Sequence, residues 1–96
     1  MARLELTEFE KKVLDKVKTI KKGQVMTYAQ VAKNIGCPGS ARAVGNALNK
    51  NPYLVKIPCH RVVKSDGSIG GYARGVKAKE ALLKSEGIKI IDRRIR

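Results

Sequence analysis

Two segments of this chain place a threonine three residues before a glutamate or glutamine, directly ahead of apolar residues at helical spacing. They are Thr7 with Glu10 and Thr27 with Gln30. In such a capping box the threonine hydroxyl accepts a hydrogen bond from the third helical amide, and the third side chain binds back to the threonine N–H. The pattern therefore predicts two helix starts, which limit the possible folds more strongly than composition does.

The first helix is expected to be amphipathic, to pack on the core and to continue until Gly23. Its apolar residues are Phe9, Val13, Leu14, Val17 and Ile20. The second helix is short and ends at Gly36, a turn occupies residues 37–39, and Ser40 can cap a third helix over 41–49. Two short helices joined by a tight glycine-containing turn form a helix-turn-helix pattern.

The third helix leaves little side-chain bulk around Arg42. Its small residues are Ala41, Ala43, Gly45 and Ala47. They allow close approach either to another helix or to the surface of a ligand, and both alternatives stay open. A glycine inside a helix costs about 1 kcal/mol relative to alanine, so Gly45 indicates a packing or contact role.

Short extended segments and turns follow the third helix. Asn51-Pro52 breaks that helix, and residues 54–57 are typical of a short strand that leads into Cys59. Residues 61–64 are extended or helical, and periodicity does not distinguish the two.

The last third of the chain begins with a turn at residues 65–68 and a glycine-rich loop at 70–75. A final helix is expected from residue 76 to about 86, with Gly87 as its stop. The residues expected on its apolar side are Ala78, Ala81, Leu82 and Leu83. The basic tail, residues 88–96, either docks as a strand or trails as an arm.

These elements predict a single α+β domain over residues 1–96. It is helix-rich, with a winged-helix-like helix-turn-helix and a short β element that carries Cys59. A chain of 96 residues has room for one core.

The charge of the chain is strongly positive. Twenty-one lysines and arginines oppose eight acidic residues, for a net charge of +13, and no acidic residue occurs from Lys16 to Ser65. A solvated lysine surface adapted to heat or crowding is one explanation. The missing acids favour a polyanionic partner instead, and nucleic acid is the leading one.

Other classes of protein and site fit poorly. No stretch approaches the length of a membrane span, and the N-terminus lacks an apolar signal core, so we expect a cytoplasmic protein. Two cysteines in an intracellular chain usually stay reduced, which argues against a disulfide between Cys37 and Cys59. With His60 they supply only three zinc ligands at unusual spacing, so no metal is expected.

One of the two cysteines lies in the run Ile57–Val63, where Cys59 is followed by the only histidine, His60, and by Arg61. A thiol attacks as a thiolate, and basic or cationic neighbours lower its pKa. Cys59 is therefore the best candidate nucleophile in the chain.

Several motifs together resemble the C-terminal, DNA-binding and active-site domain of the O6-alkylguanine-DNA alkyltransferases. They are Gly23–Val25 with Thr27–Tyr28, Ala41–Gly45, Asn51–Pro52, Ile57–Val63 and Gly70–Tyr72. The resemblance runs from about Phe9 to Gly87. It implies a single-turnover DNA repair reaction, in which the sulfur of Cys59 takes the alkyl group from guanine O6 without any cofactor.

The same resemblance implies roles for four more residues. His60 acts as a base through a water, and Glu86 orients that histidine like the third member of a triad. Tyr28 donates a hydrogen bond or proton toward guanine N3 as the base departs. Asn51 holds the reactive segment against its neighbours.

The partner implied is duplex DNA containing O6-alkylguanine, bound by a monomer. The damaged base must be rotated out of the helix, and Arg42 resembles the arginine that fills the gap. Its small neighbours let the helix enter the minor groove, and lysines contact phosphates. The residues expected at the DNA are Thr27, Tyr28, Ala41, Arg42, Ala43 and Gly45.

The resemblance also implies the walls of the substrate pocket. They are Leu48, Val62, Ile69, Tyr72, Ala73 and Arg74. Leu54 and Arg74 depart from members that accept benzyl groups, which carry proline and glycine there. We therefore expect good methyl transfer and weak reaction with benzylguanine.

Two non-enzymatic alternatives remain. Many family members carry a further N-terminal domain, which we expect to be absent here. A domain without that partner also resembles the alkyltransferase-like sensors, which bind lesions and recruit other factors. Those generally replace the reactive cysteine, whereas this chain keeps Cys59 with His60, Tyr28 and Glu86. A generic helix-turn-helix regulator would need more polar residues on its recognition helix.

Overall fold

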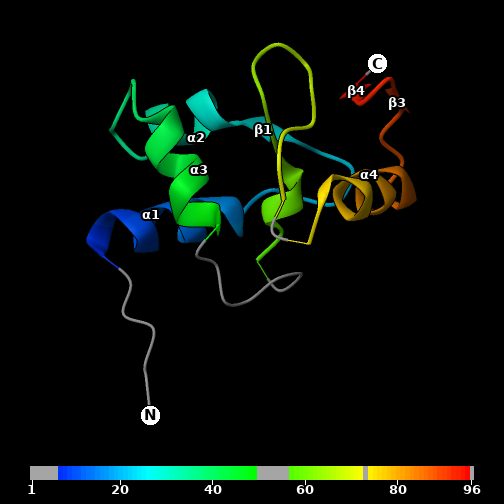
Figure 1. Cartoon of the computed structure of the whole chain (residues 1–96). Coiled ribbons are helices and arrows are strands. Elements are labelled where there is room, and N and C mark those ends of the chain that lie inside the picture. Colours follow the sequence, from blue (N-terminus) through cyan, green and yellow to red (C-terminus); the bar gives the residue numbers. More distant parts are fainter. Residues whose placement is uncertain (1–6, 50–56, 73, 96) are drawn as a thin grey trace.

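A computed structural model describes residues 7–49, 57–72 and 74–95. Their elements are α1 (Glu8–Val17), β1 (Met26–Thr27), α2 (Tyr28–Asn34), α3 (Ala41–Asn49), a 3-10 helix η1 (Cys59–Arg61), β2 (Val62–Val63), α4 (Val76–Ser85), β3 (Ile90–Ile91) and β4 (Arg94–Ile95). Figure 1 shows the first three helices on one side, α4 with the β3–β4 hairpin on the other, and η1 between them. The predicted α+β class is confirmed.

Both capping boxes form as predicted. The hydroxyls of Thr7 and Thr27 accept from the amides of Glu10 and Gln30 at 3.1 and 3.0 Å, and both return bonds are made. The prediction that the first helix reaches Gly23 is wrong, because α1 ends at Val17. A turn follows, in which the amide of residue 20 binds the carbonyl of Val17, and this turn still buries the apolar side chain.

The helix-turn-helix prediction is confirmed by α2 and α3. Gly36 and Gly39, at φ +81° and +87°, take the left-handed conformations that let the chain reverse between the helices. The buried side chains of the three helices form one core with those around η1. Its members are Val13, Leu14, Val17, Ile20, Val31, Ala32, Val44, Ala47, Leu48, Ile57, Cys59 and Val62.

A two-stranded parallel pairing positions the site. Met26 pairs with Val62, and the next residues of each strand pair in turn. Tyr28 directly follows β1 and Cys59–Arg61 directly precedes β2, so the pairing brings segments far apart in sequence together. The open question for residues 61–64 is answered: Arg61 ends η1, and β2 follows. Cys59 itself lies in the 3-10 turn before the strand, and most of the strand predicted at 54–57 lies outside the described residues.

The C-terminal segment docks rather than trails, at least through Ile95. β3 and β4 form an antiparallel hairpin, and Ile90 is buried in a second core with Val63, Ile69 and Leu83. The hairpin also binds the preceding loop, because the amide of Ile69 donates to a hairpin carbonyl at 3.0 Å.

The last helix ends as predicted, since α4 stops at Ser85 and Gly87 has a φ of +91°. Its buried face differs from the prediction: Lys79 and Leu83 are buried, whereas Ala81 is exposed. Among the described residues, no helix is long and apolar enough to cross a bilayer.

Candidate active site

Cys59 begins the short turn η1 and is 5% exposed. The amide of Cys59 donates to the carbonyl of Ile57 at 2.7 Å, and the amide of Arg61 donates to that of Pro58 at 2.9 Å. These bonds hold a tight turn at the start of β2. The thiol is therefore carried by rigid backbone, in a largely dry environment.

His60 is also buried, and one of its two ring nitrogens has a defined partner. Its Nε2 lies 3.0 Å from Oε2 of Glu86, the residue that follows α4. A carboxylate only accepts, so Nε2 carries the proton and Nδ1 of the neutral ring is left as the basic nitrogen. Nδ1 is buried and has no hydrogen-bond partner among the described residues. The imidazole is thus oriented to accept a proton at Nδ1.

Arg61 holds the same carboxylate from its other side. Its Nε and Nη2 donate to Oε1 and Oε2 of Glu86 at 2.9 and 2.6 Å, and Nη1 donates to the carbonyl of Ile20 at 2.8 Å. The bonds from Arg61, with a smaller contribution from His60, lower the pKa of Glu86. The carboxylate therefore stays ionised, and η1, α4 and the segment after α1 are tied together.

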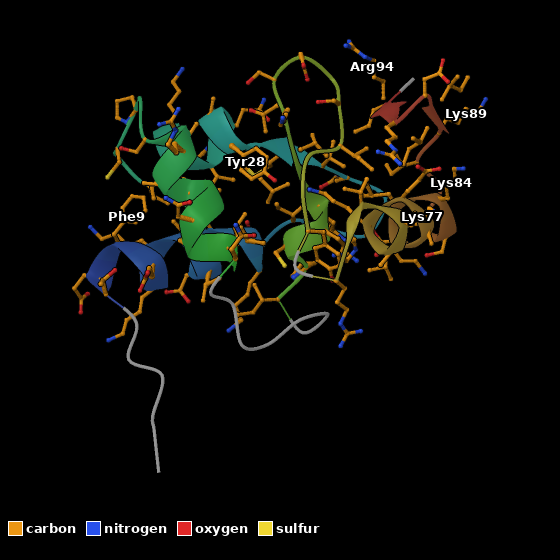
Figure 2. The ribbon with its side chains drawn as sticks, in the orientation of Figure 1. Phe9, Tyr28, Lys77, Lys84, Lys89 and Arg94 are labelled. Carbon is orange, nitrogen blue, oxygen red and sulfur yellow. The ribbon has the colours of Figure 1, made fainter. Side chains whose placement is uncertain are left out.

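Tyr28 lies between α3 and the loop of residues 64–72, which we call the pocket loop (Figure 2). A Cβ added at Gly45 would lie 3.8 Å from the Tyr28 ring, and one added at Gly70 would lie 3.0 Å from its hydroxyl. Burial, and then the negative charge of Cys59, raise the pKa of Tyr28. Its phenol thus stays protonated, as a hydrogen-bond donor must.

Lys79 is a residue that the sequence reasoning missed. Its side chain is fully buried, and its Nζ donates to the carbonyls of Val62 at 2.6 Å and Gly71 at 3.0 Å. The hydroxyl of Tyr28 lies 3.4 Å away. Burial lowers the pKa of Lys79 to about 8, against the opposing effect of the Cys59 charge. The sequence did hold a signal for its burial, because Lys79 lies three residues after Val76 and four before Leu83, on the apolar stripe of α4.

A small pocket opens beside Cys59. Its described lining residues are Tyr28, Gly45, Leu48, Asn49, Cys59, Gly71 and Tyr72. Its volume is about 10 Å³, room for about one water. The Tyr72 hydroxyl is buried without a hydrogen-bond partner among the described residues, and its ring meets that of His60 edge-on at 6.3 Å.

The structure does not bring every predicted wall residue to this pocket. Val62 is fully buried in the first core, Ile69 belongs to the second core and lines a different pocket, and Arg74 is exposed. Ala73 lies outside the described residues, and so does Asn51, the asparagine predicted to hold the reactive segment against its neighbours. Gly45, Asn49 and Gly71 line the pocket although they were not predicted as its walls.

The small residues of α3 lie partly in the core and partly at the surface. Ala47 is buried in the core, whereas Arg42 and Ala43 are exposed and Ala41 is half-buried. Gly45 faces the Tyr28 ring. Packing against the core is thus shown for one face of α3, and close approach of its exposed face to a ligand stays a prediction. The hydroxyl of Thr27, also predicted at the DNA, caps α2.

Neither cysteine forms a disulfide; Cys37 is half-buried in the turn after α2. Within the described ranges, no three His, Cys, Asp or Glu side chains gather closely enough to hold a metal ion.

Known protein sequences resemble this chain over most of its length. The model of a family described as 6-O-methylguanine DNA methyltransferase, DNA binding domain, matches residues 8–88. A methylated-DNA–protein-cysteine methyltransferase of Methanothermobacter thermautotrophicus is 48% identical over 84 residues, which are 88% of this chain and 47% of the relative. One of Saccharolobus solfataricus is 56% identical over 82 residues, which are 85% and 52%. The chain thus spans about half the length of these curated relatives.

Solved structures show the same fold. Mycobacterium tuberculosis OGT in complex with DNA matches with a TM-score of 0.83 at 42% identity, over 88% of this chain and 52% of that one. Schizosaccharomyces pombe Atl1, in complex with damaged DNA containing O6-carboxymethylguanine, matches with a TM-score of 0.81 at 34% identity, over 92% and 83%. Sequence and fold agree, and the chain belongs to the 6-O-methylguanine DNA methyltransferase family through its DNA-binding domain.

Proposed function

We propose that this protein repairs O6-alkylguanine in duplex DNA by moving the alkyl group irreversibly to Cys59. One observation carries the proposal. The carboxylate of Glu86 binds both His60 and Arg61, the two residues that follow Cys59. Cys59 lines a pocket that Tyr28 also lines. A nucleophile, a base with a defined tautomer and a carboxylate that orients it are what an activated thiol requires. The names of the curated relatives support the same reaction.

The chemical step is a single displacement. Nδ1 of His60 accepts the thiol proton through a water, and the sulfur of Cys59 forms a bond to the alkyl carbon as the bond from that carbon to guanine O6 breaks. The electron pair stays on the guanine, which gains a proton at N3 from Tyr28. The proton held by His60 then returns to the Tyr28 phenolate through water, and the guanine proton moves from N3 to N1 through water. The products are unmodified guanine and a thioether at Cys59, so each molecule reacts once.

The ammonium of Lys79 supports this step from below the pocket. It contacts the Tyr28 hydroxyl and is close enough to Cys59 for the thiolate charge to affect its pKa. A buried positive charge stabilises both a thiolate and a phenol that is losing its proton.

Access to DNA is proposed to occur along the exposed face of α3. Arg42 fills the stack when the damaged base leaves it, Ala41, Ala43 and Gly45 allow close approach, and Thr27 and Tyr28 lie at the start of the neighbouring helix. The known complexes of M. tuberculosis OGT and S. pombe Atl1 with DNA support a DNA partner for this domain. We infer a monomer acting inside the cell, where DNA and reduced thiols coexist.

A guanine does not fit a volume of about 10 Å³, so the pocket opens when the base enters. Gly70 and Gly71 allow the pocket loop to move. The preference for methyl over benzyl groups, which rests on Leu54 and Arg74, stays part of the proposal, and Leu48 and Tyr72 are the proposed walls that line the pocket. Rapid labelling of the protein by a benzylguanine dye at low concentration would contradict that preference.

Lesion binding without chemistry is a second candidate function. One observation favours it: S. pombe Atl1, in complex with damaged DNA, shares the fold of this chain with a TM-score of 0.81. The presence of Cys59 with its base and carboxylate favours the transferase.

Mass spectrometry separates the two functions. The protein is incubated with a duplex that contains O6-methylguanine, and intact protein and peptides are then weighed. The transferase predicts a gain of one methyl group on the Cys59 peptide, lost in Cys59→Ala and kept in the matched control Cys37→Ala. Tight binding of the damaged duplex without any mass gain would overturn the transferase and leave the lesion sensor.

A further inference from the structure

A second pocket adjoins the pocket loop. Its volume is about 310 Å³. Its described lining residues are Lys64, Ser68, Ile69, Gly70, Gly71, Val76 and Arg93. Gly71 lines this pocket and the Cys59 pocket alike. The two spaces therefore meet at Gly71.

The second pocket is positively charged. Lys64 and Arg93 line it and are exposed, and no carboxylate is among its described lining residues. Two acidic residues, Asp66 and Glu80, interact electrostatically with these cations but form their bonds with other residues. Asp66 accepts hydrogen bonds from the amide and hydroxyl of Ser68, and Glu80 forms an ion pair with Lys84 at 2.8 Å. Within the described parts of the chain, neither Lys64 nor Arg93 forms an ion pair. Both cations are thus available to an outside anion.

Arg93 is held at this pocket by the backbone of the β3–β4 hairpin. It is the second residue of a two-residue turn and has a φ of +61°, a conformation that glycine adopts more easily. The carbonyl of Arg93 accepts from the amide of Ile69, and the amide of Ile95 donates to the carbonyl of Gly67 at 2.9 Å. The hairpin therefore fixes the start of the arginine side chain beside the pocket loop.

We propose that Lys64 and Arg93 bind backbone phosphates of the damaged strand, next to the nucleotide whose base enters the Cys59 pocket. This inference rests on the proposed function. A base inside that pocket stays covalently linked to its sugar and phosphates, which remain outside it, and Gly71 lines both that pocket and the second one. Two exposed cations in a pocket with no aromatic side chain among its described lining residues suit a phosphodiester and not a base. Arg93 lies beyond the residues that the family model matches, so this contact belongs to the hairpin of this chain.

Two substitutions remove the charges with little harm to the fold. Arg93→Gly deletes the cation and places glycine at a left-handed position that favours it. Lys64→Gln keeps the backbone bond between the amide of Lys64 and the carbonyl of Ser68. The matched control is Lys12→Gln with Lys89→Gln, which loses the same charge. Lys12 lies on α1, and Lys89 lies beside a separate pocket near the hairpin (Figure 2).

Binding is measured as a function of salt on an O6-methylguanine duplex, with Cys59→Ser in every protein so that no reaction occurs. Each phosphate contact contributes about 0.9 to the slope of log affinity against log salt. The slope is negative, and we expect its magnitude to be smaller by about 0.9 to 1.8 in the Lys64→Gln/Arg93→Gly protein than in its parent. The slope of the control protein should differ from the parental slope by less than the slope of the Lys64→Gln/Arg93→Gly protein does.

The position of the contact is tested with neutral methylphosphonates placed at one phosphate at a time around the lesion. We expect one or two adjacent positions in the damaged strand to weaken binding by the parent and not by the Lys64→Gln/Arg93→Gly protein. Equal sensitivity of both proteins at every position, or a slope change no larger than that of the control, would overturn the proposal. Methyl transfer by the otherwise unchanged protein is measured separately, so failure of the phosphate contact and failure of the repair function are distinguished.

Discussion

His60 donates its Nε2 proton to Oε2 of Glu86 across 3.0 Å, and this single bond decides which ring nitrogen is basic. Loss of the acceptor should let the imidazole turn or change tautomer, as it does in a catalytic triad. We expect Glu86→Gln and His60→Ala to slow methyl transfer by about 10²- to 10⁴-fold, measured as mass gain on Cys59 over time. Glu80→Gln, on the outer side of α4, is the control. A rate for Glu86→Gln within twofold of the unchanged protein would contradict this role.

Acid should destabilise the domain through the same carboxylate. Arg61 and His60 lower the pKa of Glu86 below its ordinary value of 4.5, so the folded state binds its proton less readily than the unfolded state. The stabilisation is therefore present above pH 4.5 and is lost as the pH falls through the lowered pKa. Urea unfolding at pH 7 and pH 3 should show a smaller loss for Glu86→Gln than for the unchanged protein. Equal losses would show that the pairing does not stabilise the fold.

Lys79 should give methyl transfer an alkaline limit. Its pKa of about 8 means that the ammonium near Cys59 and Tyr28 loses its charge as the pH rises past that value. We expect the rate of the unchanged protein to fall above about pH 8. Lys79→Met should be roughly tenfold slower at pH 7 and should lack this fall, because it has no proton to lose there.

The control for this pH profile is Lys77→Met, an exposed residue on the same helix. Its profile should match that of the unchanged protein. If Lys79→Met kept the same alkaline fall, another group would be responsible for it.

Much of this architecture is predictable because local chemistry determines it. Each capping box involves one threonine and a side chain three residues later, and both form as the sequence predicts. The end of α1 is not predictable in this way. The turn after Val17 keeps Ile20 buried, so the apolar periodicity looks helical beyond the true end of the helix.

The site is predictable only in part, for a similar reason. Cys59 and His60 are adjacent in sequence, and their activation follows from residue type. Other members of the site come from distant segments through tertiary packing: Glu86 binds His60, and Lys79 reaches Tyr28 from α4. A lysine looks like a surface residue until the carbonyls that bind its ammonium are located.

Gly70 and Gly71 should respond differently to the same substitution. Gly70 has a φ of +77°, and a Cβ there would lie 3.0 Å from the Tyr28 hydroxyl, whereas nothing lies within 4 Å of a Cβ at Gly71. We expect Gly70→Ala to lower the free energy of unfolding by about 1–2 kcal/mol and to slow methyl transfer by displacing the phenol. Gly71→Ala should change the free energy of unfolding by less than about 0.5 kcal/mol. Equal effects of the two substitutions in urea unfolding would contradict the close contact.

Arg42 should affect the rate of methyl transfer only when the damaged base has to leave the base stack of a duplex. It is exposed at the start of α3, away from the bonds that order Cys59, so its loss should leave the thiol chemistry intact. Extrusion costs a few kcal/mol, and filling the gap recovers part of that cost. We expect Arg42→Ala to slow methyl transfer from duplex DNA by about tenfold and to leave transfer from a single-stranded oligonucleotide nearly unchanged. The comparison uses both substrates at saturating concentration, with Lys33→Ala, an exposed cation on α2, as the control for charge. Equal slowing on both substrates would show that Arg42 serves general DNA binding, because a residue that fills the gap has no role on an unpaired strand.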